Sequence, residues 1–343
     1  MLSGHMLPIH FPPAPDELLS SWYVRLAHAN RLKAETFGTI LWSRQRQIWN
    51  RDIDRLSPEW LVKELADRTG TPFDVAWKTT LKSYEGKLFP KIRQTGISPW
   101  ILPVQMYHRK HKWPGLQFCP VCLKEDEEPY FRKRWRLSIY TKCHRHNIVC
   151  MDHCPSCQEP IMFHRIKPSK SNDLNNHPLS LCHRCNFDLR QSISHPGPYY
   201  ENKAAHLVEM ATSWLEIDGN KPLPMDFYII LHQTCRLLIS NSIGHLLQPA
   251  IIDDIGVLAR TLLPTSPNRA FFEHGYTLMR HQVIQFSCWL ISNKSNLISA
   301  MHSSNIKINK LYKDLAYIPA WYISLINRLP HRDIPMLRNH NQS

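Results

Sequence analysis

The sequence predicts a mainly α-helical fold built around a small zinc-stabilised core of β and irregular structure. Eight of the ten cysteines lie between residues 119 and 185, and apolar residues at helical spacing occupy much of the chain on either side. A chain of 343 residues also exceeds what one hydrophobic core usually serves. We expect an N-terminal helix-turn-helix-like domain (10–90), a basic linker (91–118), two zinc-finger or zinc-ribbon modules (119–190) and a C-terminal helical domain (201–335).

Four pairs of metal-binding residues define the cysteine-rich stretch. Three are Cys-x2-Cys pairs and the fourth is Cys-x2-His. Two such residues on a tight turn can place both ligand atoms on one tetrahedral ion, so four pairs make two closed sites without a vertex for water. Closed sites of this kind are structural, and we expect two structural Zn2+ ions. The predicted ligands are Cys119, Cys122, Cys143 and His146 for one ion and Cys154, Cys157, Cys182 and Cys185 for the other.

The grouping of these pairs stays open on the sequence. Chain order favours the sequential grouping, but an interleaved one, with the first pair joined to the third, satisfies the same spacing. His144 is an alternative ligand to His146. A disulfide framework is the alternative to metal binding, and it requires a secreted chain. The sequence shows no signal peptide, so we expect reduced cysteines in a cytoplasmic, bacterial protein.

Helical spacing and turn residues predict three helices near the N-terminus. The first begins at Asp16 and buries one stripe, formed by Leu18, Leu19, Trp22, Leu26 and Ala29. The second has Ser57 as N-cap and ends at Gly70, because glycine suits a left-handed C-cap. Thr71 and Asp74 form a capping box for the third, which carries Lys78 and Lys82. This is the plan of a helix-turn-helix, and also of helical hairpins that bind no DNA.

The charge of the chain indicates a polyanionic partner. The formal net charge is +14, and it stays strongly positive after seven thiolates and two zinc ions are counted. No acidic residue occurs from 129 to 151, where aromatic and basic residues alternate. We expect the rings inside the zinc core and the cations outside, along a nucleic-acid backbone. The expected contacts are Lys78, Lys82, Arg109, Lys110, Lys112, Arg132, Lys133, Arg134 and Arg136.

The remaining sequence predicts helices and excludes some functions. Helices are expected over residues 204–215, 227–247, 251–263, 270–291 and 311–329. No apolar run approaches the roughly 18 residues that cross a bilayer, so we expect no membrane partner. No GxxxxGK[ST] phosphate loop occurs, which argues against an ATPase. We expect no enzymatic activity.

Several motifs together resemble the TniQ family of transposition proteins, which includes TnsD-type target selectors. PPAPDELLSSWYVRLAHANRL is similar to the family's opening helix. FCPVCL, the triplet Arg134-Trp135-Arg136, CHRH and CPSC follow in the family's order. The resemblance covers residues 10 to about 190. The chain departs from the pattern at Cys150, where leucine is usual, and in an insert at 166–181, and neither change removes a ligand.

The resemblance implies a non-catalytic adaptor. TniQ proteins recognise a target, either a DNA site or a DNA-bound, RNA-guided CRISPR effector complex. They then recruit the transposon's AAA+ ATPase regulator, and some act as dimers. The expected partners are therefore a TnsC-type ATPase, target DNA or a CRISPR effector ribonucleoprotein, and a second copy of the chain. The sequence does not distinguish the two kinds of target.

Two other functions stay open. An HNH-type nuclease would use His144, His146 and Asn147 beside paired cysteines, with a divalent ion that activates water. In that case His146 would not be available as a ligand of the structural zinc site. A sequence-specific DNA-binding regulator would use the helix-turn-helix and the zinc fingers without an ATPase partner.

Overall fold

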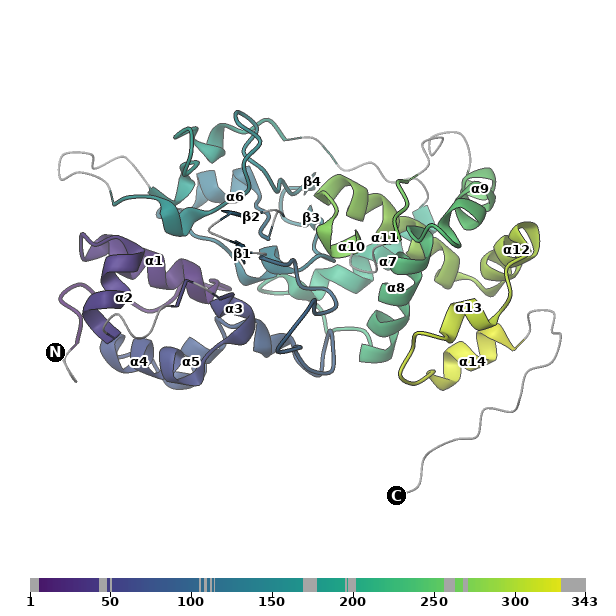
Figure 1. The fold of residues 1–343 in the computed structure, drawn as a ribbon, viewed down its shortest axis with the longest axis horizontal. Coiled ribbons are helices and arrows are strands. Elements are labelled where there is room, and N and C mark those ends of the chain that lie inside the picture. The colour runs from purple at the N-terminus through teal and green to yellow at the C-terminus, as the bar shows by residue number, and fades with distance from the viewer. Residues whose placement is uncertain are drawn as a thin grey trace, which may run out of the picture. The chain divides into compact units, whose positions relative to one another are not determined.

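The structure, a computed structural model, is mainly helical (Figure 1). It describes residues 6–42, 48–49, 51–104, 106–107, 110–111, 113, 115–168, 178–194, 196, 202–255, 263–267 and 271–327. Its helices are α1 (Leu19–Ala29), α2 (Ala34–Trp42), α3 (Ile53–Leu56), α4 (Glu59–Thr69), α5 (Phe73–Trp77), α6 (Pro120–Glu125), α7 (Asn202–Thr212), α8 (Met225–Leu238), α9 (Gly244–Ile255), α10 (Phe271–His274), α11 (Thr277–Ser292), α12 (Lys294–Ser304), α13 (Asn309–Tyr312) and α14 (Ala320–Ile326).

Two short antiparallel hairpins are the sheets of the described residues. In one, β1 (Met106–Tyr107) pairs with β2 (Lys110–His111), and Met106 lies opposite His111. In the other, β3 (Lys142–Cys143) pairs with β4 (Ile148–Val149), and Cys143 lies opposite Ile148. The expected combination of many helices with a small β and irregular part is therefore present. None of the described helices has both the length and the apolar character needed to cross a bilayer.

The chain divides into two compact units, and three separate stretches of sequence build the first. The first unit comprises Met1–Pro198, Glu209–Met225 and Ala270–Gln282, and the second comprises Tyr199–Val208, Asp226–Arg269 and Val283–Ser343. All the predicted metal ligands lie in the first unit. This unit also takes in two segments of the predicted C-terminal helical domain.

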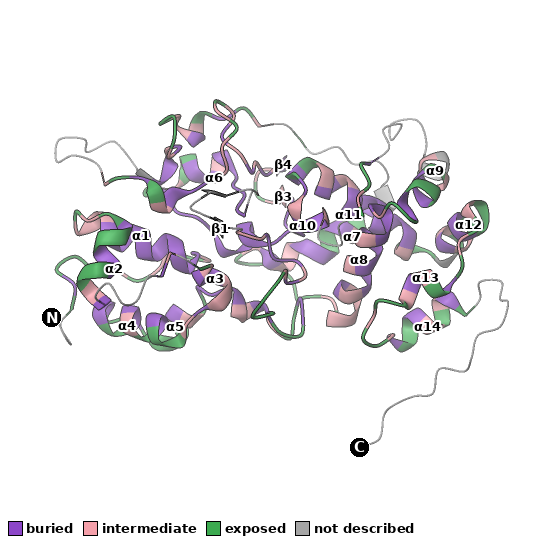
Figure 2. Ribbon diagram, in the orientation of Figure 1, coloured by how far each residue is buried: buried purple, intermediate pink, exposed green. Residues whose placement is uncertain are grey.

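α1 is buried on nearly all sides, although the sequence predicted a single buried stripe (Figure 2). Its polar residues are also inside, because each has a buried partner. The Ser20 hydroxyl donates to Asp54 Oδ2 at 2.8 Å, and the Ser21 hydroxyl donates to Glu17 Oε1 at 2.8 Å. Arg25, which is not part of the predicted stripe, pairs with Glu17 at 2.8 Å and is 8% exposed.

α4 ends as the sequence predicted, but it begins differently. Gly70 ends the helix with φ 66°, in the left-handed region that glycine adopts freely. The prediction that Ser57 caps α4 is wrong. Ser57 has φ 44° and ends α3, and its hydroxyl donates to the carbonyl oxygen of Asp54 at 2.7 Å. The N-cap position of α4 belongs to Pro58.

α5 is shorter than predicted and stops at Trp77. The expected capping box is absent from it: the N-cap is Pro72 without a side-chain cap bond, and the Thr71 hydroxyl accepts from Thr69 at 2.8 Å. Thr79 and Thr80 follow, and their hydroxyls donate back to carbonyl oxygens three residues earlier. Such local bonds compete with helical ones. Lys82 therefore lies in a separate 3-10 turn, Leu81–Tyr84.

The C-terminal predictions hold in type but not in bounds. The helix predicted over 227–247 is two helices, α8 and α9, because the chain turns between Leu238 and Gly244. The helix predicted over 270–291 is likewise α10 and α11. α12 was not predicted from the sequence. Residues 256–262, part of the helix predicted over 251–263, lie outside the described residues.

Candidate metal centres and their surroundings

The first cluster joins α6 to the β3–β4 hairpin. Cys119 is the N-cap of α6 and Cys122 lies in its first turn, while Cys143 ends β3. His146 Nδ1 lies 3.3 Å from Cys119 Sγ, 3.3 Å from Cys122 Sγ and 3.5 Å from Cys143 Sγ. All four ligand atoms lie within 4.8 Å of one another. Two segments about 20 residues apart in sequence therefore present four donors to one point.

The second cluster brings together two similar turns. Cys154 Sγ lies 3.6 Å from Cys185 Sγ, and Cys157 Sγ lies 3.6 Å from Cys182 Sγ. Each sulfur of one turn therefore has a close neighbour in the other turn. The four sulfur atoms lie within 4.8 Å of one another.

The same backbone turn occurs at three of the four ligand pairs. The amide of Asn147 donates to Cys143 O at 2.8 Å, that of Gln158 to Cys154 O at 2.8 Å, and that of Asn186 to Cys182 O at 3.0 Å. These three donors have φ between 56° and 61°. Asparagine tolerates this left-handed region better than most residues. The turn folds the chain back so that both ligands of a pair point to the same side.

The distances suit tetrahedral zinc. A Zn–S bond of about 2.3 Å gives sulfur–sulfur edges of roughly 3.8 Å in a regular tetrahedron. In the two clusters, neighbouring donor atoms lie 3.6–3.7 Å apart where both are sulfur and 3.3–3.5 Å apart where one is nitrogen. The grouping is the sequential one, and His146 rather than His144 joins the cysteines. Each group offers four protein donors to one ion, the arrangement of structural sites.

His144 contacts helix α7 and is not part of the first cluster. Its Nδ1 lies 2.8 Å from Glu209 Oε1 and its Nε2 lies 2.8 Å from Thr212 Oγ1, so both ring nitrogens have partners on the last turn of α7. Glu125, which was not predicted from the sequence, contacts the ring of His146. An acid at the end of CPVCLKE is the only sequence signal for it.

The expectation that the cations of residues 132–136 point outward is wrong. The exposed fractions of Arg132, Lys133, Arg134 and Arg136 are 3%, 8%, 3% and 2%. Arg132 binds Asp126 through two hydrogen bonds of 2.7 and 3.1 Å. Arg134 binds Asp16 at 2.8 Å and Glu216 at 2.9 Å. Lys133 Nζ donates to the carbonyl oxygen of Lys78 at 2.6 Å. Buried charges need such partners, so these side chains stabilise the fold and are not presented to phosphates.

The rings of the same stretch are inside, as predicted. Phe131 and Trp135 are fully buried and meet edge to face, with centroids 5.8 Å apart. Phe131 also stacks on Phe163 at 4.6 Å. The guanidinium of Arg132 lies 4.8 Å from the Trp135 centroid, so cation and ring share one buried cluster.

Comparison with protein families matches residues 8–149 to TniQ. This stretch is a TniQ domain. The resemblance seen in the sequence is therefore confirmed for this part of the chain, and the protein is associated with transposition. A comparison with curated proteins gives no match. The TniQ domain contains α1–α6 and the whole first cluster, and it ends at Val149, before the second cluster begins.

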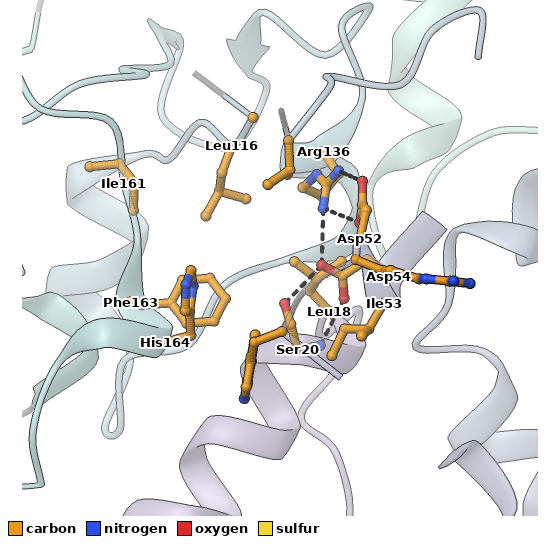
Figure 3. A pocket seen from close by; sticks show the side chains of 14 residues that line it. Leu18, Ser20, Asp52, Ile53, Asp54, Leu116, Arg136, Ile161, Phe163 and His164 are labelled. Carbon is orange, nitrogen blue, oxygen red and sulfur yellow. Dashed lines mark hydrogen bonds and ion pairs between the residues drawn. The ribbon is translucent and has the colours of Figure 1, made fainter. Parts of the chain in front are cut away.

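Arg136 crosses the TniQ domain to a pair of aspartates. Its guanidinium lies 2.6 Å from Asp52 Oδ2 and 3.0 Å from Asp54 Oδ2. Figure 3 shows these groups and Ser20 on one side of a pocket, with Ile161 and Phe163 opposite. Burial raises the pKa of Asp54 to about 6, while Arg136 lowers it. The carboxylates of Asp52 and Asp54, which line this pocket, both accept hydrogen bonds from protein donors. We therefore assign the pocket no catalytic role.

A second buried carboxylate of the TniQ domain is Glu17. Complete burial raises its pKa to about 7, while Arg25 and hydrogen bonds from Ala14 N and Ser21 oppose that rise. Arg25 also binds Glu128 at 2.6 Å. The group therefore ionises close to neutral pH.

The other predicted nucleic-acid contacts have mixed outcomes. Lys78 is exposed at the end of α5, and its Nζ lies 3.4 Å from Asp74. Lys82 Nζ lies 5.3 Å from the Trp77 centroid and 3.4 Å from the carbonyl oxygen of Ser57. Arg109 and Lys112 lie outside the described residues, and of Lys110 only the backbone is described.

Proposed function

We propose that the chain is a non-catalytic target-selection adaptor of DNA transposition. It recognises target DNA, or a CRISPR effector ribonucleoprotein bound to DNA, and recruits the transposon's TnsC-type AAA+ ATPase regulator. The observation that carries this proposal is the TniQ domain at residues 8–149, which encloses a complete four-donor cluster. TniQ proteins are generally non-catalytic accessories of transposition.

We further propose that both clusters hold structural Zn2+. When bound, each ion supplies cross-links between segments distant in sequence and no reaction chemistry. The donor sets, three thiols with one imidazole and four thiols, are those that zinc prefers, and the donor spacing supports a tetrahedral ion.

The proposed nucleic-acid surface differs from the one that the sequence suggested. Lys78 stays a candidate, because its side chain is 72% exposed. Exposed cations also flank the two clusters, namely Arg145, Arg165, Lys167 and Arg184. Cations of this kind contact phosphates without base specificity, and they make binding dependent on salt.

The geometry gives the nuclease alternative little support. Both ring nitrogens of His144 have partners in α7, and Nδ1 of His146 faces three sulfur atoms. In the HNH-type alternative, a histidine nitrogen has to face the catalytic ion and its activated water. Magnesium-dependent nicking by the purified chain that is lost in His144→Ala would favour the nuclease over the adaptor.

A pull-down with the cognate TnsC-type AAA+ ATPase tests the adaptor role. The tagged, zinc-loaded chain is mixed with the ATPase, a non-hydrolysable ATP analogue and duplex DNA at increasing salt. We expect retention of the ATPase above a tag-only control, and DNA binding that weakens as salt rises. Lys78→Ala should weaken DNA binding, whereas Lys307→Ala, an exposed lysine outside the TniQ domain, should not.

The same assay separates the remaining alternatives. Failure to retain the ATPase, together with failure to bind DNA or the effector complex at low salt, would overturn the adaptor. Tight binding to one palindromic duplex without any ATPase interaction would favour a sequence-specific regulator.

A further inference from the structure

The imidazole of His146 is held from both sides. Its Nδ1 faces the three sulfur atoms of the first cluster, and its Nε2 lies 3.0 Å from Oε2 of Glu125. The same oxygen lies 2.7 Å from Nη2 of Arg145. Glu125 is the last residue of α6, the helix that also carries Cys122 and is capped by Cys119. One short helix thus presents two thiols to the cluster and one carboxylate to the back of the imidazole.

This placement determines which ring nitrogen is available for a metal. A neutral imidazole carries one N–H, and the other nitrogen has a free lone pair. The carboxylate can only accept, so it favours the tautomer with hydrogen on Nε2 and the lone pair on Nδ1. A carboxylate in this position also makes the ligand nitrogen more basic and restricts rotation of the ring.

We propose that Glu125 is a positioning residue for the metal of the first cluster. It holds His146 in the Nε2–H tautomer, aims Nδ1 at the three thiols and slows release of the ion. This inference rests on the proposed binding of zinc. It adds Glu125, which is not one of the four ligands, to the residues on which metal binding depends. Arg145 supports it by holding Glu125 from the solvent side, where both side chains are partly exposed.

The second cluster supplies an internal reference. Its four ligands are all cysteines, so it has no imidazole for a carboxylate to orient. A change at Glu125 should therefore affect one ion and leave the other untouched. A general loss of stability would affect both.

Metal release from full-length protein tests the role. Wild type, Glu125→Gln, Glu125→Ala and the control Glu127→Gln are loaded with zinc, and release to excess chelator is followed as two kinetic phases. Glu127 is an exposed acid two residues further on. We expect one phase to be roughly 10–100-fold faster in Glu125→Ala. Glu125→Gln should be intermediate, because the amide oxygen can still accept from Nε2–H without a charge. The other phase should stay unchanged in all four proteins.

Nitrogen NMR of selectively labelled histidine reports the tautomer of His146. A purely structural role of Glu125 would leave that tautomer unchanged. In wild type His146 should show the Nε2–H tautomer, and this signature should weaken in Glu125→Ala with the fold intact by circular dichroism. Equal release rates in wild type, Glu125→Ala and Glu127→Gln would overturn the role of Glu125. Wild type that binds no zinc would instead overturn the proposed metal sites themselves.

Discussion

The two cysteine clusters have the same ligand spacing but different surroundings. In the first, Cys119, Cys122 and Cys143 are at most 1% exposed. In the second, Cys157 is half-buried and Cys185 is exposed. Donor distances are similar in both, so the ligand turns determine the shape of each site. The packing around the turns determines how much of the molecule depends on it.

The first cluster is surrounded by contacts to distant parts of the first unit. Arg280 is fully buried and donates to Ser138 O at 3.0 Å and to Gln117 Oε1 at 3.2 Å. His281 Nδ1 lies 3.0 Å from Thr141 Oγ1. The beginning of α11 is thereby attached to Gln117, before α6, and to Ser138 and Thr141, just before the β3–β4 hairpin. We infer that the first cluster supports most of the first unit. The second supports mainly residues 154–191, which meet the rest of the unit through contacts such as the stack of Phe163 on Phe131.

Substitution of one ligand in each cluster is the strongest test of this difference. Cys119→Ser should remove a metal whose binding contributes on the order of 10 kcal/mol to folding, and should unfold most of the first unit. Cys182→Ser should lose hydrogen-exchange protection mainly near residues 154–191. Exchange measured peptide by peptide compares the two variants. Equal loss of protection in α1 would show that the clusters are equivalent.

Two arginines sharpen the same contrast. Arg136→Ala leaves Asp52 and Asp54 buried without their cation and should cost about 3–5 kcal/mol of unfolding free energy. Arg184→Ala, next to Cys185, removes an arginine that is 63% exposed and paired with Glu159, and should cost less than about 1 kcal/mol. Urea unfolding at constant zinc measures both. The contrast fails if the two losses are alike.

The pH dependence of stability probes the packed side of the first unit. Folding raises the pKa of Glu17 from 4.5 to about 7, so the folded state binds more protons between these values. Stability from this group is therefore present below about pH 4.5 and is lost as pH rises toward 7, by roughly 3 kcal/mol. Glu17→Gln should remove this part of the slope in urea unfolding between pH 5.5 and 7.5.

Glu128→Gln is the matched control for that measurement, because Glu128 binds the same Arg25 with its side chain 53% exposed. Its slope should match that of wild type. A Glu17→Gln protein with an unchanged slope would show that the Glu17 carboxylate does not titrate in this range.

Alkylation should detect the smallest difference. In zinc-loaded protein, Cys185 and Cys157 should react with iodoacetamide about tenfold faster than Cys119, because modification follows exposure of the sulfur. Mass spectrometry over a time course gives the order. Earlier modification of Cys119 would contradict the difference in burial.

Local features of the fold and site were predictable, and long-range ones were not. The four Cys-x2-Cys/His pairs of the two clusters, the end of α4 at Gly70 and the burial of Trp135 follow from spacing and residue type over a few positions. The burial of Arg136 does not, because its partner Asp52 lies 84 residues earlier. The residues near Arg136 in the sequence do not indicate a partner so far away along the chain.

The sequence alone therefore determined the ligand pairs and the helical character of the chain. A Cys-x2-Cys turn closes within one segment, and the spacing of its residues already sets the separation of its sulfurs. Tertiary structure decided the grouping of the pairs, the inward direction of the cations and the unequal burial of the two clusters. The grouping of the pairs and the burial of the clusters depend on how segments distant in sequence pack together. The inward direction of the cations depends on distant carboxylates, since a charge enters the interior only where it has a partner.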